Sequence, residues 1–334
     1  MTYDRFTPMH ALILEHEDAP FRRVDMARPH PQTGQVLVRI KASSVNPLDV
    51  KIRSGNAPHA KHPLPAILGM DVAGIVEQLG PGVTQFAVGE RVYGLTGGVG
   101  GLQGSLAEFA VVDALLLARV PDRLGMREAA ALPLVFITAW EGLVDRAGVQ
   151  AHQKVLIQGA GGVGNIAIQI ARAFGAEVFA TGTDRTIKQI ERLGAAAIAY
   201  RQSTVDEYVS DHTAGRGFDL VFDTVGGATL DASFNAVRRF GHVVSCLGWG
   251  SHSLATLSFR AATYSGVFAL LPILSGEGRS HHGDILREAS RLIQAGEIQP
   301  NLDTRHFNLD TVEDAYRAVQ DGTALGKIII EVSS

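Results

Sequence analysis

Short segments in which apolar and polar residues alternate fill the first third of the chain. Residues 36–41, 71–79 and 90–93 follow this pattern, which is typical of half-buried β-strands. Glycine and proline clusters at residues 80–82 and 94–98 separate these segments, and such clusters mark turns. The close spacing of strands and turns predicts an antiparallel barrel or sandwich in this part of the chain.

The pattern changes near Met126. Residues 127–145 are long and apolar enough for a buried helix, which Pro133 would bend. Beyond them, apolar segments of strand length alternate with amphipathic segments of helix length. The predicted strands are residues 155–158, 178–181, 219–223 and 242–246, and the predicted helices are residues 165–174 and 187–193. This alternation indicates βαβ units and a parallel sheet with helices on both faces.

The last part of the chain mixes both kinds of element. We expect an amphipathic helix from Asp284 onward, a second helix over residues 311–320 and a final strand over residues 327–332. The apolar run at residues 266–271 predicts one more strand late in the alternating region. The glycine-rich residues 276–283 predict a mobile loop.

The composition excludes several classes of protein. A chain of 334 residues is long enough for about two domains, and 46% hydrophobic with 19% charged residues is an ordinary globular composition. The 34 acidic and 30 basic residues give no electrostatic reason to expect nucleic acid or an anionic membrane as a partner. The longest apolar run, residues 129–140, falls short of the about 20 residues that a membrane-spanning helix needs.

Cysteine usage narrows the choice further. Cys246 is the only cysteine, which excludes an intrachain disulfide and any zinc site built on several cysteines. It lies in a predicted core strand, where we expect it to be inert. These features together predict a soluble protein of the reducing cytoplasm.

The most informative motif is a glycine loop. Gly159-Ala160-Gly161-Gly162-Val163-Gly164 matches the pattern G-x-G-x-x-G, and it follows a predicted strand and opens a predicted helix, as a dinucleotide-binding loop must. In such a loop Gly159 permits the tight turn, Gly161 the close approach of a pyrophosphate, and Gly164 close packing of the helix. The phosphates would lie at the helix N-terminus. The alternative is a glycine turn that only packs a βαβ unit.

The end of the next strand distinguishes the two common dinucleotides. NAD sites usually carry an acidic residue there, which binds the ribose 2′-hydroxyl. In this chain Thr183 and Arg185 follow the strand, and Lys188 comes shortly after them. Arg185 and Lys188 could bind a 2′-phosphate or could be solvated residues at a helix start, and Asp184 could be a displaced acidic residue. The pattern favours NADP(H) over NAD(H).

Ordered motifs extend over nearly the whole chain. They lie at residues 44–49, 53–55, 68–74, 80–83, 89–92, 129–131, 138–139, 159–164, 194–195 and 326–328. Together they resemble the medium-chain dehydrogenase/reductase superfamily and, within it, the zinc-independent quinone oxidoreductase branch similar to zeta-crystallin. The resemblance implies an α/β protein with a GroES-like, β-rich catalytic domain and an inserted Rossmann domain with a doubly wound parallel sheet. The implied divisions are residues 1–126, the inserted domain at 127–270, and a return to the catalytic domain at 271–334.

The same resemblance bears on metal binding. Alcohol dehydrogenases of this superfamily hold a catalytic zinc with Cys, His and Cys, and the corresponding positions here are Asn46, Met70 and Leu134. An amide, a thioether and an aliphatic side chain cannot assemble a zinc site, so we expect no zinc. Asp71, which follows Met70, is expected to be a hydrogen-bonded structural carboxylate.

Without a metal, the reaction implied is hydride delivery from NADPH to a quinone or an α,β-unsaturated carbonyl. Asn46 either donates a hydrogen bond to a substrate carbonyl or is bonded within its own loop. Lys51 either donates to the acceptor or the nicotinamide ribose, or is a surface charge. Thr138 resembles a family threonine near the nicotinamide, although its hydroxyl could equally bond a helix carbonyl. Tyr200 either lies against the adenosine end of the cofactor or packs at a strand end.

The histidine pairs His59 with His62, and His281 with His282, are expected to be solvated loop residues rather than metal ligands.

Two other functions stay open beside the zinc-independent reductase. One is a zinc-type alcohol dehydrogenase, and the other is a dinucleotide-binding protein without turnover. In the family that the chain resembles, a strand in the region of residues 266–271 pairs with its twin across a dimer axis. Because an uncovered apolar edge strand needs such a partner, we expect a homodimer, with a small molecule as substrate.

Overall fold

The computed structural model describes residues 8–333, and the chain divides into two compact units. Unit 1 comprises the chain up to Leu134, residues Leu270–Ala295, and the chain from Gln299 onward. Unit 2 comprises Val135–Ala269 with the short stretch Gly296–Ile298. The chain therefore builds most of unit 1, then unit 2, and then returns to complete unit 1.

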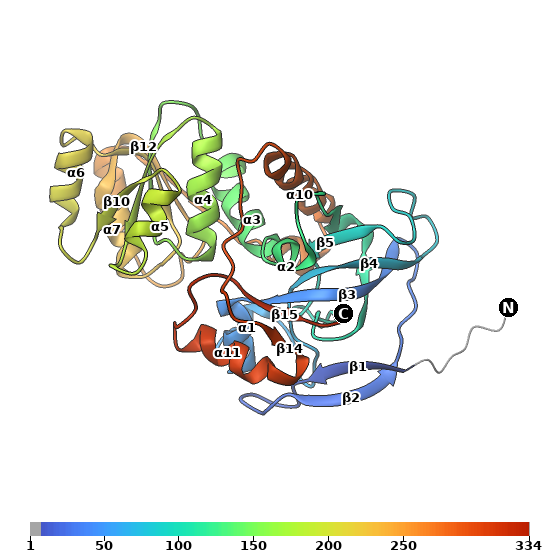
Figure 1. Cartoon of the computed structure of the whole chain (residues 1–334). Helices are drawn as coiled ribbons and strands as arrows, with labels where there is room; N and C mark the ends of the chain where they lie inside the picture. Colours follow the sequence, from blue (N-terminus) through green and yellow to red (C-terminus); the bar gives the residue numbers. More distant parts are fainter. Residues whose placement is uncertain (1–7, 334) are drawn as a thin grey trace. The chain divides into compact units, whose positions relative to one another are not determined.

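Unit 1 is built on antiparallel strands. Its larger sheet has the order β14-β15-β3-β4-β5-β7, with β6 paired to β3, and β1 with β2 forms a separate pair (Figure 1). The strands are β1 Pro8–Ile13, β2 Arg22–Ala27, β3 Gln35–Val45, β4 Asp71–Leu79, β5 Arg91–Leu95, β6 Phe109–Asp113, β7 Leu117–Arg119, β14 Phe307–Asn308 and β15 Ile328–Glu331. Alternate residues of β3, Val36, Val38 and Ile40, face a shared core with Val72 and Val76 of β4, which confirms the alternating pattern seen in the sequence.

Five helices accompany these strands among the described residues. They are α1 Pro47–Arg53, α2 Met126–Ala130, α9 Leu271–Ser275, α10 Arg279–Gln294 and α11 Val312–Gln320. Short 3₁₀ turns lie at Pro58–Ala60, Ala114–Leu116 and Leu309–Thr311. In α10 the buried residues Ile285, Leu286 and Ala289 form one stripe, as an amphipathic helix on a core requires.

Unit 2 contains a six-stranded sheet with the order β10-β9-β8-β11-β12-β13. Every neighbouring pair in it is parallel. The strands are β8 Lys154–Gln158, β9 Glu177–Gly182, β10 Ala196–Ala199, β11 Phe218–Asp223, β12 Val237–Ser245 and β13 Thr263–Gly266. The order runs outward in both directions from β8 and β11, so the topological switch point lies between these two strands.

Helices cover both faces of this sheet (Figure 1). They are α3 Pro133–Trp140, the π-helix Glu141–Arg146, α4 Gly162–Ala173, α5 Ile187–Arg192, α6 Val205–Thr213, α7 Ala228–Ala236 and α8 Ala255–Arg260. Leu156 and Val221 share a core with residues of α6, α7 and α8. Their neighbours Ile157 and Phe222 point to the opposite face, where they approach Gly164 of α4 and Gly142 of the π-helix.

Three sequence-based predictions need correction. The single bent helix over residues 127–145 is divided among α2, α3 and the π-helix. The strand predicted at residues 266–271 lies earlier, at Thr263–Gly266, because Leu271 with the following proline begins α9.

The predicted mobile loop at residues 276–283 is the third. Only its first residues form a turn, and α10 already begins at Arg279. His282 and Gly283 continue the buried stripe of this helix, and a Cβ on Gly283 would lie 2.5 Å from the carbonyl oxygen of Leu115. His282 is therefore a buried helix residue rather than a solvated loop residue.

Among residues 8–333, no helix has the length and the hydrophobicity needed to span a bilayer.

Candidate active site

The glycine loop joins the end of β8 to the start of α4, so the strand–loop–helix context predicted for it is confirmed. Gly159 has a φ of +91°, a conformation that favours glycine. A Cβ on Gly164 would lie 1.9 Å from the carbonyl oxygen of Gly159, so only glycine lets the helix pack so close to the loop. At Gly161 an added Cβ would meet no atom of the described chain within 4 Å. The space beside Gly161 is therefore open at the N-terminus of a helix of 12 residues, a position that favours an anion.

The residues expected to select the dinucleotide follow the next strands. Strand β9 ends at Gly182, and the backbone N–H of Thr183 donates to Oγ1 of Thr186 at 2.9 Å in the turn before α5. Arg185 and Lys188 are exposed in this turn and in the first part of α5. Tyr200 follows β10 and is 47% exposed. Because β8, β9 and β10 are parallel, these residues and the glycine loop follow strand ends at the same edge of the sheet.

Two threonine hydroxyl groups, of which that of Thr181 is buried, hold the strand end that leads into the glycine loop, and the sequence alone did not reveal them. The backbone N–H of Gly159 donates to Oγ1 of Thr181 at 3.0 Å, and this hydroxyl donates to Oε1 of Gln158 at 2.9 Å. The hydroxyl of Thr224 donates to the carbonyl oxygen of Gln158 at 2.8 Å. The end of β8 is therefore held by threonines at the ends of both neighbouring strands.

A second set of polar side chains is buried in unit 1. Asp71, at the start of β4, is fully buried and accepts hydrogen bonds from Ser44 Oγ at 2.5 Å, from Asn46 Nδ2 at 2.9 Å and from the backbone N–H of Leu134 at 2.8 Å. The prediction of a hydrogen-bonded structural carboxylate is confirmed. Asn46 also donates from Nδ2 to Asp49 at 3.2 Å and from its backbone N–H to the same carboxyl at 2.8 Å.

This arrangement determines what Asn46 can do. Its amide nitrogen is directed at two carboxyl groups, so its two hydrogens are engaged within the protein. Its Oδ1 accepts a hydrogen bond from Nζ of Lys327, which lies 3.4 Å from Asp71 Oδ2. The side chain of Lys327 is 10% exposed and that of Asp71 is 1% exposed. Asn46 is therefore bonded within its own loop to Asp49, and its side chain also links Asp71 to Lys327.

Asp49 is the second acid of the cluster. Burial, opposed by the hydrogen bond from the backbone of Asn46 and reinforced by the charge of Asp71, raises the pKa of Asp49 from 3.8 to about 7. Since two neighbouring buried carboxylates repel each other, one of them retains its proton more easily. The positive charge of Lys327 acts in the opposite direction and lowers the pKa of Asp49.

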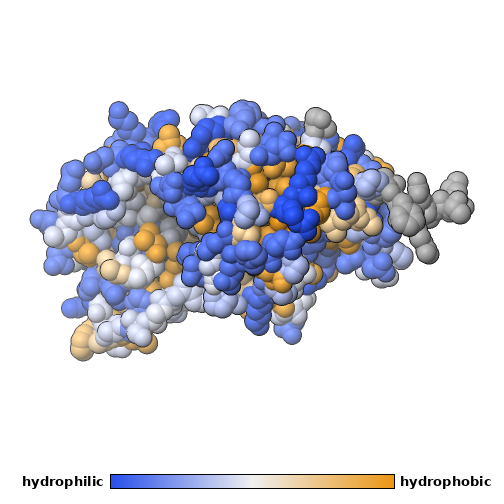
Figure 2. Space-filling model, turned by 90° about the horizontal axis from the view of Figure 1, so that it is seen from below, coloured by the Kyte–Doolittle hydropathy of each residue, from blue (hydrophilic) through white to orange (hydrophobic). Residues whose placement is uncertain are grey.

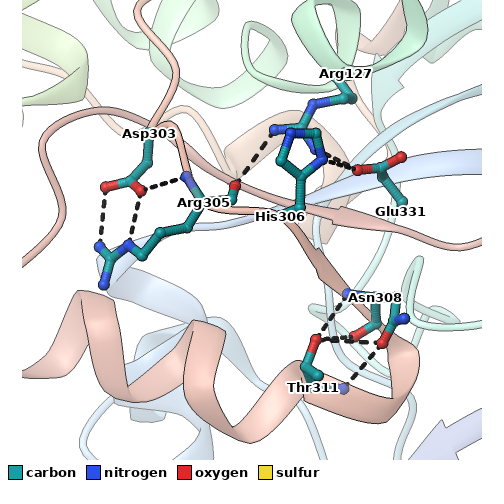
Figure 3. A network of polar contacts seen from close by, with 7 residues as sticks. All are labelled: Arg127, Asp303, Arg305, His306, Asn308, Thr311 and Glu331. Carbon is teal, nitrogen blue, oxygen red and sulfur yellow. Dashed lines mark hydrogen bonds and ion pairs between the residues drawn. The ribbon is translucent and has the colours of Figure 1, made fainter.

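Lys327 reaches this cluster because the chain returns to unit 1 after it has formed unit 2. A Cβ on Gly326 would lie 2.5 Å from the carbonyl carbon of Leu302, so glycine is needed for the two segments to approach. Asp303 accepts a hydrogen bond from the backbone N–H of Leu325 at 2.9 Å and is paired with Arg305 through both carboxylate oxygens (Figure 3). Hydrogen bonds from Arg305 hold the pKa of Asp303 well below its usual range. The segment before Lys327 is thus fixed by a charged pair.

Farther along the same segment, a second charged group ties the C-terminal strand to α2. Arg127 pairs with Glu331 of β15, and Nδ1 of His306 lies 2.8 Å from the same carboxylate (Figure 3). Asn308 and Thr311 close the following turn through mutual hydrogen bonds.

The remaining candidate residues are not part of the hydrogen-bonded cluster around Asp71. Lys51 is exposed on α1, and burial together with the charge of Lys51 lowers the pKa of His59. Thr138 is buried in α3 and belongs to unit 2. Cys246 directly follows β12, and burial with the nearby Asp223 raises the pKa of its thiol to about 12, as expected for an inert cysteine. Neither Lys51 nor Thr138 takes part in the described bonds around Asn46.

The positions that correspond to the zinc ligands of alcohol dehydrogenases hold other groups in this chain. Met70 is fully buried, and Leu134 meets the cluster through its backbone N–H. Within the described chain, no three His, Cys, Asp or Glu side chains are placed to hold a metal ion.

His62 accepts a hydrogen bond from Gly101 at 3.3 Å, and its pKa is lowered by burial.

Comparisons with known proteins agree with this architecture. A family model described as alcohol dehydrogenase GroES-like domain matches residues 32–122, and one described as zinc-binding dehydrogenase matches residues 193–330. A crystal structure of an alcohol dehydrogenase superfamily protein from Novosphingobium aromaticivorans has a TM-score of 0.96 and 57% identity, over 97% of this chain and 100% of that one. The predicted α/β fold, with a GroES-like domain and a parallel-sheet Rossmann-like domain, is confirmed.

Curated relatives include proteins of very different lengths. A 2-methylene-furan-3-one reductase of Solanum lycopersicum is 33% identical over 315 residues, which cover 92% of this chain and 74% of that protein. The phthioceranic/hydroxyphthioceranic acid synthase of Mycobacterium tuberculosis is 36% identical over 324 residues, or 95% of this chain and 14% of the synthase. The chain spans between 5% and 18% of the length of such synthases.

Two further solved structures share the fold over nearly their whole length. The CurK enoyl reductase has a TM-score of 0.85 and 25% identity, over 98% of this chain and 100% of that one. The quinone oxidoreductase from Coxiella burnetii has a TM-score of 0.84 and 26% identity with the same coverage.

Proposed function

The chain belongs to the medium-chain dehydrogenase/reductase superfamily of oxidoreductases, and on this basis we propose that it is a zinc-independent, NADPH-dependent reductase of its quinone oxidoreductase branch. The acceptors proposed are quinones and α,β-unsaturated carbonyl compounds. The names of an enoyl reductase, a 2-methylene-furan-3-one reductase and a quinone oxidoreductase among its relatives support these classes.

One observation carries the zinc-independent mechanism. The positions that hold catalytic zinc in related alcohol dehydrogenases are Asn46, Met70 and Leu134 here, and their surroundings hold the ammonium group of Lys327 against Asn46 and Asp71. An amide nitrogen bonded to carboxylates, a buried thioether and an aliphatic chain do not form a zinc site. Without a metal to stabilise an alkoxide, alcohol oxidation loses its usual catalyst, whereas a quinone or enone is already electrophilic.

The glycine loop fits a dinucleotide. Open space at Gly161, the left-handed Gly159 and the close approach at Gly164 are the features that such a loop needs to receive a pyrophosphate. Thr183, Arg185 and Lys188 would hold the 2′-phosphate of NADPH, because two exposed cations follow β9 and Asp184 is the only acidic residue in that turn. Tyr200 would lie against the adenosine end.

When bound, NADPH supplies a hydride from its nicotinamide ring. The chain binds the phosphates at the N-terminus of α4 and orients the cofactor through residues that follow β9. Thr138 is the proposed contact of the nicotinamide and Lys51 the proposed donor to the acceptor oxygen. Asn46 contributes indirectly in this proposal, since it keeps Lys327 and Asp71 in fixed positions.

The same purified protein can test function and cofactor together. NADPH and NADH oxidation would be measured with ortho-quinones, para-quinones, enones, aldehydes and alcohols, alongside metal analysis of the protein. The proposal predicts turnover of quinones or enones with NADPH preferred. Tightly held zinc at one ion per chain with alcohol oxidation would favour the zinc-type alcohol dehydrogenase. Dinucleotide binding without turnover of any acceptor would favour a binding protein.

We also propose a homodimer through unit 2. Strand β13 is the last strand of its sheet, and the neighbouring segment exposes Trp249, Leu254 and Phe259, the last at 86%. Exposed apolar side chains that lie close together are common where proteins associate, whereas the face drawn in Figure 2 is largely hydrophilic with scattered apolar patches. Light scattering after size exclusion would show a dimer, and Phe259→Glu would shift it toward the monomer. A monomeric wild type would contradict this proposal.

A further inference from the structure

Thr181 lies at the end of strand β9, and its buried hydroxyl contacts the first glycine of the glycine loop. The backbone ladder between β8 and β9 ends with the pair Ile157 and Ala180. Just beyond the last pair, the backbone N–H of Gly159 donates to the hydroxyl of Thr181 at 3.0 Å instead of to a backbone carbonyl. The side chain of Thr181 therefore extends the ladder by one hydrogen bond, into the first glycine of the loop.

The bond belongs to a directed chain of donors and acceptors. Gly159 donates to Thr181, Thr181 donates to Oε1 of Gln158 at 2.9 Å, and Nε2 of Gln158 lies 3.4 Å from the hydroxyl of Tyr208. Gln158, Thr181 and Tyr208 are each at most 4% exposed. In a buried environment such chains are strengthened by mutual polarisation, and a lost member leaves its partners without water as a substitute.

We propose that Thr181 is a positioning residue for dinucleotide binding, whose hydroxyl fixes Gly159 and with it the pyrophosphate loop in the conformation that receives the cofactor. This inference rests on the proposed dinucleotide-dependent function. Without the hydroxyl, the N–H of Gly159 has no described acceptor, and the loop can leave the conformation seen here. The apparent dissociation constant then rises in inverse proportion to the fraction of molecules that keep the competent loop.

The proposal makes a prediction about selectivity. Thr181 acts on the loop that would hold the pyrophosphate, which NADPH and NADH have in common. Its loss weakens binding of both dinucleotides by the same factor and leaves their ratio unchanged. Substitution of Arg185, in contrast, would weaken NADPH alone, because only NADPH carries the 2′-phosphate.

The chain offers a matched control. Thr213, at the end of α6 in the same unit, is also buried, and its hydroxyl also accepts a hydrogen bond from a glycine, the backbone N–H of Gly217 at 2.9 Å. Thr213→Val removes the same kind of bond as Thr181→Val, but at a turn outside the glycine loop. A general loosening of unit 2 would affect both variants alike.

The experiment measures NADPH and NADH dissociation constants by nucleotide fluorescence for the wild type, Thr181→Val, Thr181→Ser and Thr213→Val, with thermal unfolding of each. Thr181→Val should raise both constants by about tenfold, Thr181→Ser should restore them, and Thr213→Val should leave them at the wild-type values. Wild-type constants in Thr181→Val, or an equal rise in Thr213→Val, would overturn the inference.

If Thr181→Val does not fold, Gln158→Met carries the test, since it removes the acceptor that orients the hydroxyl and should also raise both constants. Unchanged binding in that variant would overturn the inference. A wild-type protein that binds neither dinucleotide would instead defeat the proposed function.

Discussion

Asp49 sits in an unusual position for a carboxyl group. It is fully buried near a second buried acid, Asp71, and the cluster contains one ammonium group, that of Lys327. One positive charge cannot compensate two buried negative charges, because each ion loses its hydration. Protonation of Asp49 near neutral pH relieves this imbalance, which is why burial raises its pKa to about 7.

The raised pKa makes stability depend on pH. Between pH 3.8 and about 7 the folded chain keeps a proton on Asp49 that the unfolded chain has released. The free energy of unfolding therefore falls as pH rises through this interval, by at most about 1.4 kcal/mol per pH unit from this group. Asp49→Asn should abolish that contribution, so that the stability of the wild type relative to the variant declines from pH 4.5 to pH 7.

Urea unfolding at several pH values measures this difference. Asp211→Asn, which changes an exposed aspartate of α6, is the control and should follow the wild type. A constant difference between the wild type and Asp49→Asn across the interval would show that Asp49 is already ionised in the folded protein.

Lys327 is predicted to matter for stability as well as for the site. Lys327→Met removes the cation next to Asp71, whose side chain is 1% exposed, and leaves that buried carboxylate uncompensated. Such losses cost about 3 kcal/mol. Arg317→Met breaks the exposed pair with Asp314, where both side chains are more than 60% exposed, and should cost no more than about 0.5 kcal/mol. Equal effects in chemical unfolding would contradict the role of Lys327.

At the scale of elements, two glycines of the β8–loop–α4 segment are expected to have different effects, one on folding stability and the other on cofactor binding. Gly164→Ala places a methyl group 1.9 Å from the carbonyl oxygen of Gly159, so α4 must move, at a cost of at least about 2 kcal/mol. Gly161→Ala meets no described atom within 4 Å and should cost less than about 1 kcal/mol. Its methyl group would instead occupy space proposed for the pyrophosphate.

Gly164→Ala should therefore mainly lose stability, and Gly161→Ala should mainly lose NADPH affinity. Thermal unfolding should detect a large loss in Gly164→Ala and a small one in Gly161→Ala, while NADPH titration should show weakened binding in Gly161→Ala despite its intact fold. Undiminished NADPH affinity in Gly161→Ala would exclude the loop as the phosphate site.

Sequence patterns predicted elements best where one periodicity dominates. The boundaries of β4 agree with the predicted segment 71–79, and the glycine loop lies between strand and helix as expected. The failures occur where a local signal competes with tertiary packing. Gly276–Gly283 resembles a loop in composition, yet Gly283 is required for α10 to approach the carbonyl of Leu115, and no local pattern reveals that contact.

The candidate site shows the same limit at the scale of the whole molecule. The motif residues Asn46 and Gly159 could be selected from the sequence, but the partners that define their roles could not. Lys327 reaches Asn46 because the chain returns to unit 1 after building unit 2. Thr181 reaches Gly159 because parallel pairing sets β8 beside β9. Both contacts depend on register and chain return, which single-sequence periodicity does not encode.

The proposed function makes one more prediction at the scale of the whole molecule. With NADPH at the glycine loop and Lys327 beside Asp71 in place of a zinc site, as proposed above, we expect reduction of an activated double bond rather than of a carbonyl group. These two reactions transfer the same hydride to different carbons. The position of the new hydrogen in the product therefore distinguishes them.

The most direct test follows the hydride itself. NADPH deuterated at C4 of the nicotinamide would be supplied with an enone, and the product analysed by NMR and mass spectrometry. The proposed function predicts deuterium on the carbon β to an intact carbonyl group. Deuterium on the carbinol carbon of an alcohol product, with the double bond preserved, would contradict it.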